Sequence, residues 1–148
     1  DADRAMNLVW FRSKLSATLP DVKGSVLDER VTAEELDGLT KSAAAADVAI
    51  VAVFDDVVAW KGRSGPSEEL LAAARRLIET APDAIVLAFT GPEISMELPE
   101  AATLVCCYDG SEPSQRAAVS ALFGESPLTG RLPVDIPPLF KAGTGLKR

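Results

Sequence analysis

The sequence predicts an α/β fold, a three-layer α/β/α sandwich with a mostly parallel sheet, and two observations carry that prediction. Three apolar runs, 47–54, 84–89 and 102–108, are nearly continuous rather than alternating, which is typical of strands covered on both faces. Segments with helical periodicity separate them, as in βαβ units. Because a chain of 148 residues has the length of about one domain, we expect a single domain over 1–148.

Four longer helices are predicted, at 3–18, 32–46, 67–80 and 111–124. In the second, Thr32 followed by Glu35 forms a capping-box pattern. The third has the i, i+4, i+7, i+8 spacing of a buried stripe, supplied by Leu70, Leu71, Ala74, Leu77 and Ile78.

The fourth helix begins at Ser111 as N-cap, has Pro113 early and stops at Gly124. Weaker strand patterns lie at 23–28 and at 131–136, and Pro133 would confine the latter to an edge or to its first residues.

The composition limits the classes of partner that we expect for the chain. The net charge is −7 and no basic stripe is present, so we expect no nucleic-acid partner. No apolar run approaches 18 residues, so we expect no membrane span, and the compartment, cytoplasmic or exported, stays open.

Cys106 and Cys107 are adjacent, and on a strand their side chains point to opposite faces, so we expect two small hydrophobic residues rather than a disulfide.

The chain contains no histidine, which excludes Ser-His and Cys-His nucleophile pairs and every histidine-containing metal site. With two adjacent cysteines and no CxxC, zinc has no ligand set. We expect neither a metal nor a cofactor.

The stretch "AWKGRSGPSEELL", residues 59–71, resembles a phosphate-binding loop at first sight. A Walker A loop places Lys after its last glycine, whereas Lys61 precedes the glycines and Pro66 follows Gly65. A Rossmann fingerprint needs G-x-G-x-x-G, and this loop offers only G-x-x-G. Pro66 also removes an N–H where a phosphate would need one. We therefore expect Gly62 and Gly65 to be conformational, at least one with positive φ, and to bind no nucleotide.

A different class of protein stays open at this point. Asp55 and Asp56 follow the first apolar run, and ligands of open α/β sheets bind outside the carboxyl ends of the strands. The chain would then be a free-standing α/β module that binds a small ligand, or a receiver-like module.

Two longer segments carry a family resemblance. Residues 46–94 contain a strand, a V-x-x-x-K-G-x-x-G loop, a helix and a strand ending in "FTGP". The segment "YDGSEPSQRAAVSALFGESPLTGRLPVDIP", residues 108–137, matches Y-x-x-S-x-x-S-Q-x-A-x-x-x-A-L-F-G-x-x-P-x-x-G-x-L-P-V-x-I-P at nearly every fixed position. These patterns resemble the carboxy-terminal sandwich domain of family 3 glycoside hydrolases, of β-N-acetylglucosaminidase or β-glucosidase type. The resemblance is good over 47–146 and looser over 3–46.

The resemblance implies that a separate domain supplies the catalytic nucleophile. Retaining glycosidases use two carboxyl groups, and in this family the nucleophile is an Asp on an amino-terminal TIM barrel, which 148 residues cannot contain. One branch places the acid/base Glu on the sandwich domain, and the other places an Asp–His pair on a barrel loop. The loop at 57–65 resembles the second branch, so we name no catalytic residue and expect the isolated chain to be inactive.

The resemblance also implies the expected partner, the catalytic TIM-barrel domain of the same precursor. The loop that contacts the substrate or the barrel would contain Asp55, Asp56, Lys61, Arg63 and Ser64. The family's domain begins with a strand, whereas this sequence opens on a helix. We therefore expect the first strand to be missing between 23–28 and 48–54, and either another chain from the precursor or a homodimer to cover the open edge.

Overall fold

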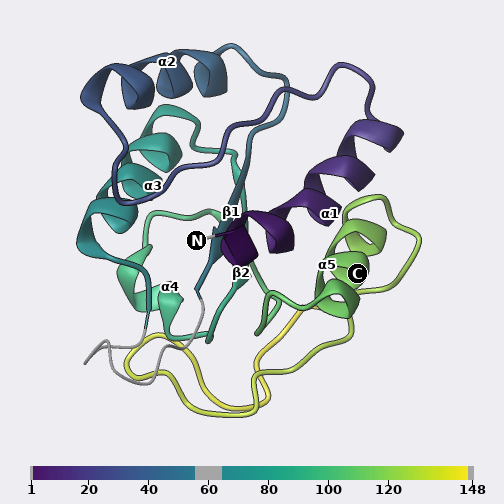
Figure 1. Ribbon diagram of the computed structural model, residues 1–148. Helices are drawn as coiled ribbons and strands as arrows, with labels where there is room; N and C mark the ends of the chain where they lie inside the picture. The colour runs from purple at the N-terminus through teal and green to yellow at the C-terminus, as the bar shows by residue number, and fades with distance from the viewer. Residues whose placement is uncertain (1, 56–64, 147–148) are drawn as a thin grey trace. The chain divides into compact units, whose positions relative to one another are not determined.

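The computed structural model describes residues 2–55 and 65–146 (Figure 1). Its helices and strands, in chain order, are α1 (Ala2–Thr18), α2 (Ala33–Ala44), β1 (Ile50–Phe54), α3 (Glu68–Thr80), β2 (Ile85–Phe89), α4 (Ile94–Glu97), β3 (Thr103–Cys106) and α5 (Glu112–Leu122). The four longer helices and the three main strands predicted from the sequence are confirmed, and the strands are one to three residues shorter at their ends than the apolar runs.

The chain divides into two compact units. One is Lys23–Asp109, and the other consists of Asp1–Val22 together with Gly110–Arg148.

The unit Lys23–Asp109 is built on a parallel sheet with the strand order β1-β2-β3. Ala52 is registered with Leu87, and Leu87 with Val105. Every strand pair is parallel and helices connect the strands, so the predicted α/β class and parallel sheet are confirmed. The three-layer arrangement stays a prediction.

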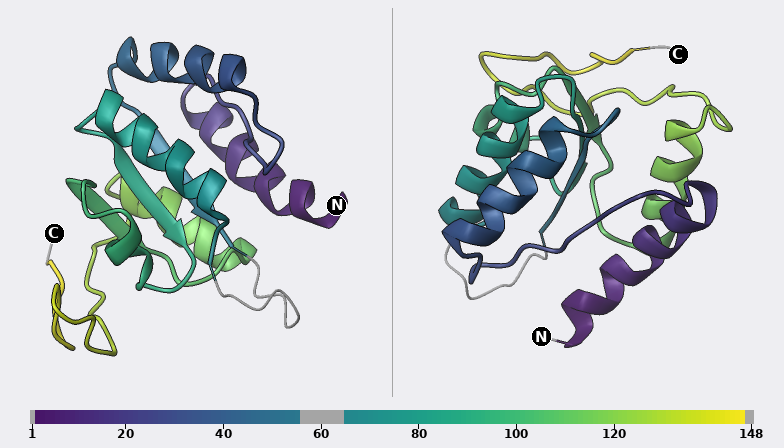
Figure 2. Two further views of the ribbon diagram at one scale, coloured as in Figure 1. Left: turned by 90° about the vertical axis from the view of Figure 1, so that its left-hand side faces the viewer. Right: turned by 90° about the horizontal axis from the view of Figure 1, so that it is seen from above.

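One face of this sheet carries the hydrophobic core of the unit. The stripe predicted on α3 is buried there at Leu71, Ala74 and Ile78, and helix α2 packs in turn on α3 (Figure 2). The buried residues of this core are Leu71, Ala74, Ile78, Val86, Ala88, Ile94 and Leu98.

Local signals set the beginnings of α2 and α3. Glu35 N–H donates to Thr32 Oγ1 (3.2 Å) and Thr32 N–H donates to Glu35 Oε2 (2.8 Å), so the predicted capping box is confirmed. The backbone hydrogen bond from Thr32 is the main reason that the pKa of Glu35 is lowered. At α3, Ser67 is the N-cap, and its side chain accepts from the Leu70 N–H at 3.4 Å.

In the other unit, α1 packs against α5. Phe11 and Leu15 of α1 and Val119 of α5 are buried, and the Arg116 guanidinium lies 4.7 Å from the centre of the Trp10 ring. As predicted, Ser111 is the N-cap of α5, and Gly124 just after the helix has φ +70°.

The strands predicted at 23–28 and 131–136 are wrong. Residues 23–28 form no regular element, and Val26 is 49% exposed. In the second segment the chain bonds locally instead: Leu132 N–H donates to Thr144 O, and Ile136 pairs with Phe140 in a single antiparallel bridge. Both segments have apolar residues in a strand-like pattern, but among residues 2–55 and 65–146 no strand pairs with them.

The strand order also corrects the expected position of a missing strand. Since 23–28 is not a strand, it cannot flank one, and β1 lies at an edge of the described sheet. Ile85 N–H donates to Ala49 O, and Asp55 N–H donates to Phe89 O. In a parallel pair of strands, the backbone N–H and C=O groups of successive residues point alternately toward and away from the neighbouring strand. Because the groups of Ala49 and Asp55 point toward β2, those of Ile50 and Ala52 point away from it. A second chain or a homodimer at this edge stays a prediction.

Candidate functional site

Three loops of the unit Lys23–Asp109 follow the carboxyl ends of its strands. Asp55 follows β1, residues 90–93 follow β2, and residues 107–109 follow β3. Because the strands are parallel, these ends share one edge of the sheet, which is where α/β domains bind ligands. This carboxyl edge is the candidate site.

At the first loop, the carboxylate of Asp55 is already engaged. Asp55 Oδ2 accepts a hydrogen bond from the backbone N–H of Gly65 at 2.8 Å, in a half-buried position. Gly65 has φ +108°, a conformation that a residue with a Cβ rarely adopts. The expectation that Gly62 or Gly65 has a positive φ is thereby confirmed, and Asp55 fixes the point where the loop rejoins the described chain.

The rest of the predicted contact loop, Asp56, Lys61, Gly62, Arg63 and Ser64, lies outside the described residues. Its predicted contact with the substrate or a barrel stays a prediction.

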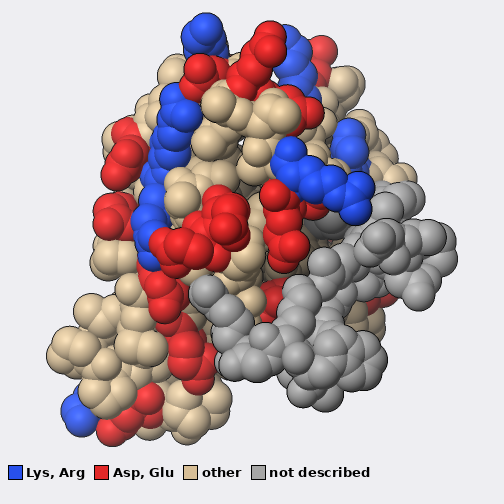
Figure 3. All heavy atoms as spheres, turned by 60° about the vertical axis from the view of Figure 1, so that its left-hand side comes forward, with Lys and Arg blue, Asp and Glu red and all other residues tan. Residues whose placement is uncertain are grey.

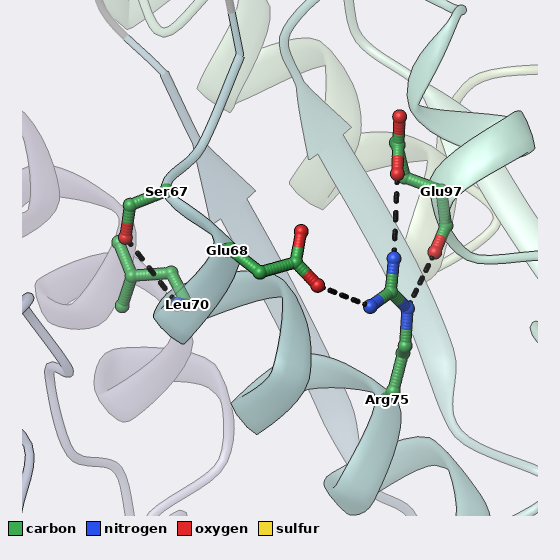
Figure 4. Close-up of polar contacts among 5 residues, drawn as sticks. All are labelled: Ser67, Glu68, Leu70, Arg75 and Glu97. Carbon is green, nitrogen blue, oxygen red and sulfur yellow. Dashed lines mark hydrogen bonds and ion pairs between the residues drawn. The ribbon is translucent and has the colours of Figure 1, made fainter.

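Beyond this loop, Arg75 connects the start of α3 to α4 (Figure 4). Its guanidinium donates to Glu68 Oε1 at 2.8 Å and to the Glu97 carbonyl oxygen at 2.9 Å, with a longer contact of 3.3 Å to Glu97 Oε2. These bonds connect the end of α4 to the middle of α3. Basic and acidic side chains accordingly lie beside one another on the face shown in Figure 3.

The second loop presents a carboxylate. Glu93 is exposed, and in the described part of the chain its side chain has no hydrogen-bond or ion-pair partner. The carboxylate folds back over Gly91, where an added Cβ would collide with Glu93 Oε2.

The third loop presents the single tyrosine of the chain. Tyr108 has φ +69°, and Asp109 N–H donates to Cys107 O at 2.9 Å across it, as in a γ-turn of the strained kind. A bulky residue in the left-handed region costs about 1–2 kcal/mol. The side chain of Tyr108 is 43% exposed.

Besides burial, the charge of Glu93 affects the pKa values of two groups at and just after the end of β3, Cys106 and Tyr108. Burial, with smaller contributions from the charges of Cys106 and Glu93, raises the pKa of Tyr108. Burial also raises the pKa of the Cys106 thiol, and again Glu93 adds to the effect. Since Cys107 N–H donates to Ala88 O, the loops after β2 and β3 leave the sheet side by side.

The adjacent cysteines are both free thiols, as expected. Burial is the main cause that raises the pKa of Cys107 from 9.0 to about 12. Because a thiol reacts as its thiolate, Cys107 is a poor nucleophile at neutral pH.

Sequence reasoning found Asp55 but missed Glu93 and Tyr108. Glu93 stands after the "FTGP" pattern and Tyr108 before Asp109-Gly110, a turn signal, so each lies beside a feature that the sequence does show. What the sequence lacks is any indication that the two loops meet.

The fold and this edge define Lys23–Asp109 as an α/β unit with a parallel sheet and a candidate ligand site at its carboxyl edge. No protein-family model, curated protein or solved structure matches the chain. Within residues 2–55 and 65–146, no helix is long and apolar enough to cross a membrane, and no three potential metal-ligating side chains gather.

Proposed function

We propose that this chain is the carboxy-terminal α/β domain of a family 3 glycoside hydrolase. It supports the hydrolysis of β-linked sugars, β-N-acetylglucosaminides or β-glucosides, by a catalytic TIM-barrel domain of the same precursor. The observation that carries the proposal is the long match to the family pattern over residues 108–137.

The positions of that match have clear conformational roles. Ser111 begins α5, Gly124 ends it in a left-handed conformation, and Ile136 is buried at 2% exposure. These residues shape helix ends and turns. Such roles support an accessory domain, which contributes its fold to the enzyme rather than a catalytic group.

The carboxyl edge supports the same proposal. The Asp55 bond to Gly65 joins the end of β1 to the residues just before α3, and the Arg75 bonds to Glu68 and Glu97 join α3 to α4. An edge connected in this way can present a surface to a barrel or to a sugar bound on it. The chain would supply that surface, and the barrel would supply the carboxylate nucleophile.

Intact-mass analysis of the polypeptide in its natural source tests the proposal. We expect a polypeptide larger than this 15.6 kDa chain, extended by about 250 residues or more of barrel sequence, or a tightly associated barrel polypeptide. A polypeptide of 15.6 kDa with no barrel bound to it would contradict the proposal.

A further inference from the structure

Two groups at the carboxyl edge have no structural task among the described residues. Glu93 is exposed and makes no hydrogen bond or ion pair there, and Tyr108 presents a ring that is 43% exposed, with no bond to its hydroxyl. By contrast, Asp55, Glu68 and Glu97 each bond a neighbouring group.

The backbone at one of the two groups is nevertheless strained. Tyr108 adopts φ +69°, where glycine, asparagine or aspartate would be less strained, and the exposed Glu93 carboxylate lies over Gly91. Strained backbone of this kind clusters at functional sites, which makes the exposed ring of Tyr108 a candidate for contact with a ligand.

The two groups lie on adjacent loops. Ala88 is registered with Cys106, and Cys107 N–H donates to Ala88 O, so the chain leaves β2 and β3 side by side toward the same edge. The influence of the Glu93 charge on Tyr108 agrees with this proximity.

We propose that Glu93 and Tyr108 form a sugar-binding subsite at the carboxyl edge of the sheet. The exposed tyrosine ring stacks on the C–H face of a pyranose, and the Glu93 carboxylate accepts hydrogen bonds from its hydroxyl groups. The acidic net charge of −7 favours a neutral ligand over an anionic one. The choice of a β-linked sugar rests on the proposed function.

Tyr108 is the only tyrosine, so a single fluorine resonance can report on the site after labelling with 3-fluorotyrosine. We expect N-acetylglucosamine or methyl β-D-glucopyranoside to shift this resonance saturably, whereas glycerol at the same concentration does not. Absence of a saturable shift with both sugars would overturn the proposal.

Variants then test the two groups separately, with amide NMR spectra as the readout. Glu93→Gln should raise the sugar Kd about tenfold, because a charged acceptor is lost. The matched control Glu79→Gln changes an exposed carboxylate in the last turn of α3 and should leave Kd unchanged. Equal effects of the two substitutions would contradict the subsite.

For the ring, Tyr108→Phe should retain binding, whereas Tyr108→Gly should abolish it while raising the thermal stability, since glycine relieves the left-handed strain. Measuring both binding and thermal stability of these two variants shows whether binding is lost because the ring is absent or because the chain has unfolded. Sugar binding retained in Tyr108→Gly would show that the ring has no role.

The outcome is separable from that of the proposed function. A source polypeptide that contains a barrel, together with an isolated chain that binds neither sugar, would overturn the subsite alone. Sugar binding by a chain whose source polypeptide contains no barrel would support the subsite and overturn the proposed function.

Discussion

The carboxylate of Asp55 accepts a hydrogen bond from the backbone N–H of Gly65, ten residues further along the chain, at 2.8 Å. The two residues stand on either side of residues 56–64. This bond joins the end of β1 to the residues just before α3, and it gives Asp55 a structural role at the edge where the sequence predicted a contact with ligand.

Replacement of Asp55 tests that role. Asp55→Ala should lower the free energy of unfolding by about 1–3 kcal/mol, because it leaves a half-buried N–H without its charged acceptor. Urea denaturation measures the change. The matched control is Asp83→Ala, an exposed aspartate before β2, which should change stability by less than about 0.5 kcal/mol. Equal stabilities of the two variants would mean that the Asp55 bond contributes nothing.

Two glycine-to-alanine substitutions should change the stability of the chain in opposite directions. Gly65→Ala should destabilise the chain by more than about 1 kcal/mol, because φ +108° strains any residue with a Cβ. Gly38→Ala should stabilise it by about 0.5–1 kcal/mol, since Gly38 lies within α2 and an added Cβ meets no atom within 4 Å. Thermal unfolding of both variants checks the signs, and stabilisation by Gly65→Ala would rule out the conformational role.

The buried thiol of Cys107 predicts a loss of stability at alkaline pH. Its pKa rises from 9.0 to about 12 on folding, mainly through burial. Between pH 9.0 and about 12, the Cys107 thiol has released its proton in the unfolded state and keeps it in the folded state. The unfolded state therefore binds fewer protons in this pH range. The free energy of unfolding therefore falls as the pH rises above 9.0 toward about 12, and this contribution is fully present below that range.

Urea denaturation at pH 8, 9, 10 and 11 measures this slope. Cys107→Ala should show a shallower decline than the unmodified chain over the same range, because the buried thiol no longer titrates. Parallel declines in the two proteins would place the alkaline sensitivity elsewhere.

Much of the fold could be predicted because its signals are local. The Thr32–Glu35 capping box, the stripe on α3 and the end of α5 at Gly124 each depend on residues within one or two turns. The strand patterns at 23–28 and 131–136 failed because a strand exists only with a partner, and no local signal shows which partners are available.

The candidate site was predictable only in part, for a related reason. Asp55 follows an apolar run, so its position at a strand end could be read from the sequence. The placement of Glu93 and Tyr108 on adjacent loops depends on the register of β2 and β3. This register is a relationship between two strands, and a pattern along the chain does not contain it.

The most direct test of the proposed accessory role is the hydrolysis of 4-nitrophenyl β-N-acetylglucosaminide and 4-nitrophenyl β-glucoside. The polypeptide isolated from its natural source and the 148-residue chain are assayed side by side. We predict turnover of at least one substrate by the source polypeptide and none by the chain alone, because under the proposed function the nucleophile would lie on the barrel. Turnover by the chain alone that is lost on replacing Asp55, Asp56 or Asp109 would contradict the accessory role.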